Sequence, residues 1–237
     1  MKSKAKLLFM ALAAMIIAAC SEKPVSPDTP YVIEGEVTGI DDGVEIILAE
    51  YDGLVGTRIA TDTLTNGKFH FKEVMREPEL NWLSVYVASE KFPSMPCWIY
   101  VAPGAHIRVI GRDNHVYTWD VESKVSEQQA NNELLKVAKA EYDEYQSLLL
   151  ASRKASKAFQ AIDRDKEPER RKEAYNHYMD INNQMDSLYV EIQGKEIVQM
   201  RKMKPSKPWL REMDTMSQTS TAYKDYKYRD DVIALYK

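Results

Sequence analysis

The hydrophobic period of this sequence changes once, between residues 121 and 126, and that change constrains the fold more than any other feature. Before it, short runs of β-branched and aromatic residues alternate with turn residues, as in all-β sandwiches and barrels. After it, apolar residues recur about every 3.6 positions, and Gly194 is the only glycine left. The sequence therefore predicts an α+β fold, with an antiparallel β-sandwich followed by an antiparallel helical hairpin and short terminal helices.

Eight runs are expected to form strands, at residues 31–37, 45–51, 58–64, 68–74, 83–88, 97–102, 106–110 and 116–121. Residues 41–43 (Asp-Asp-Gly) and 66–67 (Asn-Gly) suit tight turns, because glycine and asparagine tolerate positive φ. Three tryptophans in or beside these runs are expected to fill the sandwich core: Trp82, Trp98 and Trp119.

The helical half opens with Ser126 and Gln129, whose spacing fits a capping box. One helix is expected from there along a stripe of Ala138, Tyr142, Tyr145, Leu149 and Phe159. A polar break at residues 163–168 precedes a second helix, which begins near Glu169 and has heptad-like apolar spacing. Two long helices with so short a link predict an antiparallel hairpin. Residues 209–216 and 222–236 are expected to form the terminal helices.

The N-terminus has the organisation of an export signal. Residues 1–19 combine a basic start with thirteen uncharged residues, too few to span a bilayer. They lead to Cys20, and the tetrapeptide Ile-Ala-Ala-Cys at 17–20 resembles a bacterial lipobox. We therefore expect a signal peptide at 1–19, a lipidated tether at 20–30, a β-sandwich domain at 31–122 and a helical domain at 123–237. The protein is then anchored by lipid to a bacterial envelope membrane, facing the periplasm.

Composition argues against nucleic-acid binding and against redox chemistry at a cysteine. Removing the leader takes away three of the 32 basic residues and none of the 36 acidic ones, and the resulting net charge of minus seven argues against nucleic acid as a partner. Cys97 is then the one remaining thiol, and its apolar neighbours favour a buried, inert cysteine over a redox residue.

No catalytic, metal or cofactor site stands out in the sequence. The chain shows no glycine-rich phosphate loop and no Ser/His/Asp motif. His106 and His115 could meet across a hairpin, but no ligand spacing accompanies them. Five acidic residues could collect calcium, although turn formation and solvated strand positions account for them better: Asp41, Asp42, Glu45, Glu50 and Asp52. A pair of general-acid and general-base carboxylates stays open, because such pairs come together through folding.

The helical half is rich in tyrosine, which is common both in cores and at interaction surfaces. The tail at residues 223–236 is the best candidate for docking a partner, an envelope protein in this setting. Its candidate partner-binding residues are Tyr223, Tyr226, Tyr228 and Tyr236.

The runs Tyr-Val-Ile-Glu-Gly at 31–35, Gly-Lys-Phe-His-Phe at 67–71 and Pro-Gly at 103–104 resemble the uncharacterised β-rich N-terminal domain of many Bacteroidetes thioredoxin-like (AhpC-TSA-type) lipoproteins. Residues 126–129 and 230–236 resemble the helical linker that follows in those proteins. The resemblance implies that a thioredoxin-fold domain with a Trp-Cys-x-x-Cys site comes next. This chain stops at Lys237, so a truncated or split version of the architecture is expected.

Three functions follow. The first is a non-catalytic envelope lipoprotein that acts as a binding or positioning module. The alternative is the front half of a thiol-disulfide oxidoreductase involved in periplasmic redox homeostasis. A third possibility is a surface-exposed lipoprotein that binds a glycan or a host ligand.

Overall fold

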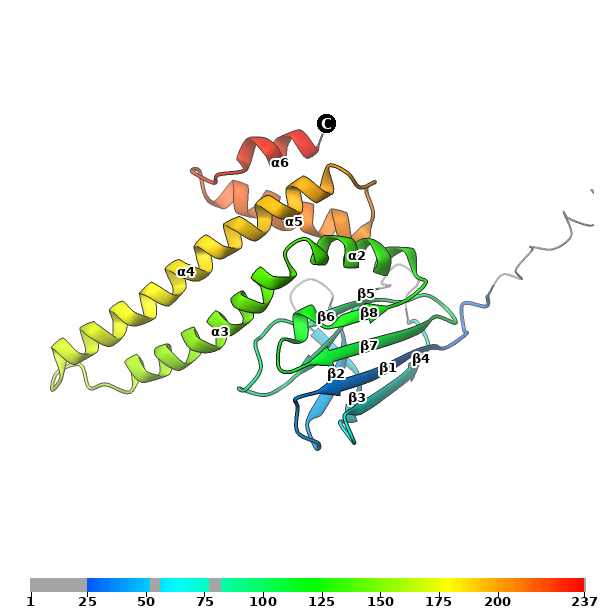
Figure 1. The fold of residues 1–237 in the computed structure, drawn as a ribbon, viewed down its shortest axis with the longest axis horizontal. Helices are drawn as coiled ribbons and strands as arrows, with labels where there is room; N and C mark the ends of the chain where they lie inside the picture. Colours follow the sequence, from blue (N-terminus) through cyan, green and yellow to red (C-terminus); the bar gives the residue numbers. More distant parts are fainter. Residues whose placement is uncertain (1–24, 52–55, 77–81, 237) are drawn as a thin grey trace, which may run out of the picture.

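The structure, a computed structural model, describes residues 25–51, 56–76 and 82–236. Two four-stranded sheets are followed along the chain by five described α-helices (Figure 1). This is the α+β fold that the change in hydrophobic period predicts. Cys20, residues 1–19, where a signal peptide is expected, and Asp52 lie outside the described residues.

The first sheet has the strand order β4-β1-β7-β8. Its strands are β1 (Tyr31–Thr38), β4 (Lys68–Glu73), β7 (His106–Arg112) and β8 (Asp120–Glu122). The second sheet has the order β3-β2-β5-β6. Its strands are β2 (Glu45–Tyr51), β3 (Gly56–Thr63), β5 (Trp82–Val87) and β6 (Cys97–Tyr100).

The described strand pairs are antiparallel except for β1 with β7, which run parallel. Parallel neighbours need a long crossover connection. Here the whole second sheet and β4 lie between β1 and β7 in the sequence. Alternation within each strand predicts the faces of a sheet but not the order of its strands, so this pairing is a finding of the structure.

The turn between β3 and β4 forms as the sequence predicts. Asn66 and Gly67 both have positive φ, 52° and 69°. Asp42 fixes this turn from a distant loop, because its carboxylate accepts hydrogen bonds from the backbone N–H groups of Asn66 (2.9 Å) and Gly67 (3.1 Å). Asp42 is therefore a turn-stabilising residue.

Two glycines make room for two aromatic side chains of the sandwich core. A Cβ on Gly35 would lie 1.9 Å from the ring of Phe69, and a Cβ on Gly111 would lie 2.7 Å from the indole of Trp119. Trp119 is buried, as predicted, but Trp82 and Trp98 are not core residues. They are half-buried and stack on each other at 4.9 Å, because they alternate with the inward-facing residues of β5 and β6.

The last predicted strand, at residues 116–121, is wrong in its first half. Residues Val116–Thr118 form a short 3₁₀ helix, η1, and only Asp120–Glu122 pair with β7.

The helices are α2 (Ser126–Lys136), α3 (Lys139–Gln160), α4 (Pro168–Met200), α5 (Lys207–Ala222) and α6 (Arg229–Leu235). The long helices α3 and α4 form the predicted hairpin, which extends to the left in Figure 1. Within the described part of the chain, no helix has the length and apolar character needed to cross a bilayer.

Three helical predictions are corrected. Ser126 lies inside α2 and makes no capping bond, because the N-cap is Val125 and the Ser126 hydroxyl donates to Glu127 instead. The first helix is two helices, since the chain breaks at Val137 and Ala138. In the terminal helix expected at 222–236, Ala222 is the last residue of α5, and only Arg229–Leu235 form a separate helix.

Candidate functional site

Helix α2 closes one edge of each sheet. Gln128 Oε1 accepts a hydrogen bond from the backbone N–H of Tyr100 at 2.8 Å, on edge strand β6. Asn132 Nδ2 donates to the backbone oxygen of Val121 at 2.7 Å, on edge strand β8. The two amides are one helical turn apart and bonded to each other at 2.8 Å. Unpaired edge groups are ready templates for further strands, and each of these amides bonds one backbone group of an edge strand.

Helix α3 is fastened to the loops of the sandwich. Gln146 Oε1 accepts from the backbone N–H of Tyr117 at 3.0 Å. Arg153 donates to the backbone oxygens of Glu90 (2.9 Å) and Phe92 (3.0 Å) in the loop between β5 and β6. These contacts with backbone groups hold the hairpin in one orientation against the sandwich.

The structure brings together a Ser-His-Asp group that the sequence did not indicate. His115 Nε2 lies 3.0 Å from Ser147 Oγ, and its Nδ1 lies 3.3 Å from Asp113 and 3.8 Å from Asp143. Ser147 sits inside α3, where neighbouring N–H groups are engaged in helical hydrogen bonds and cannot stabilise an oxyanion. Its hydroxyl also donates to the backbone oxygen of Asp143. The group therefore serves to fasten α3 to the 113–118 loop.

A charged cluster lies where α4 and α5 meet the sandwich. Arg211 on α5 donates to Glu212 at 2.6 and 3.0 Å, to Asn131 at 3.0 Å and to the hydroxyl of Tyr100 at 3.1 Å. Its guanidinium also lies 5.4 Å from the ring centre of Trp98. One side chain thus links α5 to α2 and to strand β6.

Glu196 on α4 is the most deeply buried acidic group of this cluster, at 3% exposure. Its carboxyl accepts one hydrogen bond, from the hydroxyl of Tyr142 at 2.6 Å. Burial raises the pKa of Glu196 well above its ordinary value, and the charge of Glu212 raises it further, against the smaller opposing effects of Tyr142 and Arg211.

Glu196, Arg211 and Glu212 line a small cavity of about 10 Å³. That is close to the space one water molecule needs, and it is too small for an organic substrate. Trp119 lines the cavity, and its buried indole N–H has no hydrogen-bond partner among the described residues. The site is therefore a closed polar junction that joins both halves of the chain.

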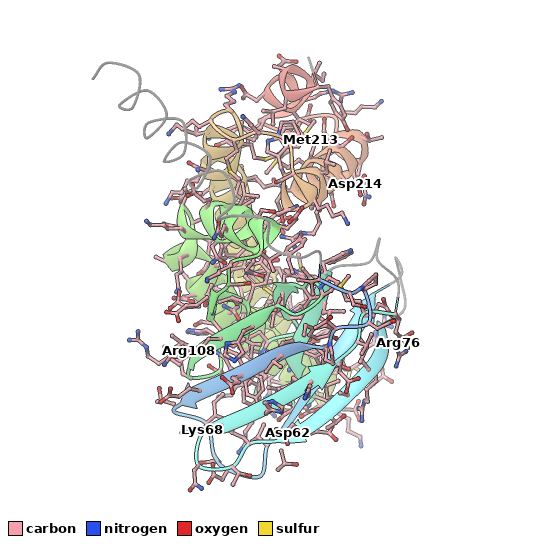
Figure 2. All side chains as sticks on the ribbon, turned by 90° about the vertical axis from the view of Figure 1, so that its right-hand side faces the viewer. Asp62, Lys68, Arg76, Arg108, Met213 and Asp214 are labelled. Carbon is pink, nitrogen blue, oxygen red and sulfur yellow. The ribbon has the colours of Figure 1, made fainter. Side chains whose placement is uncertain are left out.

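The outer face of the first sheet is open and charged. Figure 2 shows Arg108 and Lys68 on this side of the sandwich, away from Met213 and Asp214 on α5. Arg108 pairs with Glu36 at 3.2 Å and with Glu122 at 3.4 Å. Exposed ion pairs of this kind contribute roughly 0–1 kcal/mol each to stability, so those on this face are solvated surface contacts.

The four candidate docking tyrosines fall into two groups. Tyr226 is buried, and Tyr228 packs on α4 where Gly194 leaves space, because a Cβ there would lie 2.2 Å from its hydroxyl. Both hold the tail against α4, and the Tyr226 side chain is buried and therefore not available to a partner. Tyr223 and Tyr236 are 67% and 65% exposed.

The remaining candidate residues have structural surroundings. Cys97 is buried at the wall of the cavity, and desolvation raises the pKa of its thiol to about 12. His106 pairs with Glu34 at 3.0 Å and not with His115. Across the described ranges, no group of three or more histidine, cysteine or acidic side chains is arranged to hold a metal ion.

The amides of the junction were not predicted from the sequence. Gln128, Asn132 and Gln146 continue, in both directions, the helical stripe of Ala138 and Tyr142. Amides at stripe positions are the signal that would have predicted a buried polar interface.

Comparisons with protein-family models, with curated proteins and with solved structures find no match for this chain.

Proposed function

We propose that this protein is a non-catalytic positioning module, tethered by lipid at Cys20 to a bacterial envelope membrane, that presents its helical hairpin to a partner. The fastening of α2 and α3 to the sandwich carries the proposal. Gln128 and Asn132 fasten α2 to edge strands of the two sheets, and Gln146 fastens the hairpin helix α3 to η1, so the hairpin is held in a defined direction relative to the sandwich.

The position of the hairpin supports this role. Residues 25–30 reach the sandwich from one side of the molecule, and the hairpin tip lies at the opposite side (Figure 1). Helix α4 has 33 residues and is therefore about 50 Å long at 1.5 Å per residue. The module can hold a binding end well away from its tether.

The tip is built as a small ordered unit. Arg171 donates to the backbone oxygens of Phe159 (3.2 Å) and Ile162 (2.5 Å), which lie at the C-terminal end of α3. Its guanidinium stacks 4.3 Å from the ring centre of Phe159, which also packs against Tyr175 at 5.3 Å. Tyr175 is still 44% exposed. The tip therefore presents an aromatic surface held in place by α3 and α4.

The charge of one groove at the tip favours an acidic segment of a partner. A shallow groove beside the aromatic residues is lined by three cations, Arg164, Arg171 and Lys172, and one acid, Asp165. An acidic segment of an envelope protein would complement this charge, and tyrosine next to arginine is a common composition of binding surfaces.

Site-specific photo-crosslinking in envelopes tests the proposal. A photoreactive residue in place of Tyr175 should give one discrete crosslinked product, as should one in place of Tyr223 if the tail contributes. The matched control is His70, on the outer face of the first sheet, which should give none. A product from His70 but none from either tyrosine position would contradict the assignment. The mass of the extracted protein tests the lipid on Cys20 independently.

The redox alternative finds no support in the thiol of this chain. Cys97 is fully enclosed, and a thiol with a pKa near 12 supplies almost no thiolate at neutral pH. Insulin-disulfide reduction by the purified chain, lost in Cys97→Ser, would restore that alternative.

A further inference from the structure

We propose that Glu196 carries a proton in the closed junction at neutral pH, and that loss of this proton opens the contact of α4 and α5 with the edge of the sandwich. The junction is then a proton-linked latch within the module.

Glu196 has too few partners to be ionised in the closed junction. Its carboxyl receives one hydrogen bond, from Tyr142. Four of the five N–H groups of the nearby cation, Arg211, bond Glu212, Asn131 and Tyr100, and its ion pair is with Glu212 rather than with Glu196. A buried carboxylate with a single donor and no ion pair is costly, whereas a protonated carboxyl in the same place is not.

The position of Glu196 adds to this cost. Glu196 and Glu212 line one cavity, so ionisation of Glu196 would place two negative charges beside one arginine. The titratable groups around Glu196 are Tyr142 of α3, Tyr117 of η1, Arg211 and Glu212 of α5, Tyr189 on its own helix α4, Tyr226 of the α5–α6 turn, and Cys97 of β6 on the cavity wall. Arg211 is the one cation among them, and it already pairs with Glu212.

The same two carboxyl groups connect the charge to a movement of the helices. Glu196 lies on α4, Glu212 and Arg211 on α5, and Arg211 also binds strand β6 through Tyr100. Repulsion between the two carboxylates therefore acts between α4 and α5, next to the Arg211 side chain that joins α5 to the sandwich. Water entering the cavity would relieve it, and that requires the helices to move apart.

Reactivity of Cys97 measures this opening, because the thiol lies on the wall of the same cavity. The experiment uses the full chain carrying Cys20→Ser, in which Cys97 is the only thiol. Alkylation rates by iodoacetamide are compared at pH 6, 7 and 8 with and without Glu196→Gln. The parent rate is divided by the Glu196→Gln rate at each pH, and this cancels the pH dependence that comes from ionisation of the thiol itself.

The ratio of the parent rate to the Glu196→Gln rate is expected to rise with pH, by at most tenfold per pH unit for one linked proton. Glu191→Gln, on the exposed side of α4, is the matched control and should follow the parent. A ratio that stays constant between pH 6 and 8 overturns the proposal.

Two further variants keep the test decisive. Tyr142→Phe removes the hydrogen-bond donor that favours ionised Glu196, so the increase of the Cys97 alkylation rate with pH should extend to higher pH. An unchanged pH profile of this rate contradicts the latch, even if Glu196→Gln does not fold. In a variant with Ile46→Cys and Cys97→Ser, the thiol lies in the sandwich core on β2 and reports global unfolding. Equal rates and equal pH dependence for the two thiols would assign the effect to unfolding and overturn the local opening.

Discussion

The backbone N–H of Tyr100 donates to the side chain of Gln128 at 2.8 Å, so a helix occupies the position where another strand would pair with β6. Gln128 is fully buried, and its side-chain amide donates to Asn132, which in turn donates to the backbone oxygen of Val121 on β8. Two amides one turn apart thus bind the edges of two different sheets. This arrangement fastens α2, the first helix of the helical half, to both sheets.

Replacing Gln128 by alanine should lower the free energy of unfolding by roughly 1–3 kcal/mol, because it leaves the N–H of Tyr100 buried without a partner. Denaturant unfolding measures the loss. The control is Gln129→Ala, one residue along α2 and exposed, which should change stability by less than about 0.5 kcal/mol. Equal losses in both variants would mean that the edge contact is not stabilising.

Trp119→Ala should cost about 3–5 kcal/mol, because this indole fills the core above Gly111. Trp82→Ala removes a half-buried ring that stacks on Trp98, and should cost only about 1 kcal/mol. Thermal unfolding of the two variants compares the positions. A larger loss for Trp82 would contradict the assignment of the sandwich faces.

The strands show how far sequence reasoning reaches in this chain. Alternating residues such as Phe69 and Phe71 predict strand and face correctly, because a one-residue shift would expose the core. The same alternation placed Trp82 and Trp98 wrongly, since it does not tell which face of an aromatic-rich strand is covered. Nor could it predict the parallel pairing of β1 with β7, which depends on contacts far apart in sequence.

The junction shows where such reasoning fails. Gln128 and Glu196 are polar residues on amphipathic helices, and such residues ordinarily face solvent. Their burial depends on tertiary partners, Tyr100 in one case and Tyr142 in the other, that no local pattern identifies. For a similar reason, the sequence does not show which tyrosines of the tail pack against the other helices. Tyr228 packs in the space that Gly194 leaves on α4, and this glycine is the one sequence feature that marks the position.

Gly194→Ala should displace Tyr228, whose hydroxyl lies 2.2 Å from the position of the added Cβ. Global stability should change little, since alanine also favours the helix by up to about 1 kcal/mol over glycine. Amide hydrogen exchange should instead accelerate in α6, because Tyr228, the residue just before α6, packs this part of the tail against α4. Gln184→Ala, at an exposed position of α4, is the control, and unchanged exchange in α6 of the Gly194 variant would contradict the packing role of this glycine.

Glu196 gives the stability of the protein a defined dependence on pH. Because its folded pKa is raised by burial, the folded chain binds more protons than the unfolded chain above the ordinary glutamate pKa. Its contribution is therefore complete below about pH 4.5 and is lost as pH rises toward the folded pKa. Glu196→Gln should flatten this decline in a series of unfolding curves. An equally steep decline in the variant would assign the pH dependence to other groups.

The most direct test of the positioning role is the distance between the sandwich and the hairpin tip. Spin labels at His70→Cys and Lys172→Cys, both on exposed positions, report it by double electron–electron resonance in a chain that also carries Cys20→Ser and Cys97→Ser, so that no other thiol takes up the label. A single narrow distance distribution is expected, and it should broaden when Gln128→Ala and Asn132→Ala remove the contacts with both sheet edges. A broad distribution before those substitutions would contradict a hairpin held in a fixed direction.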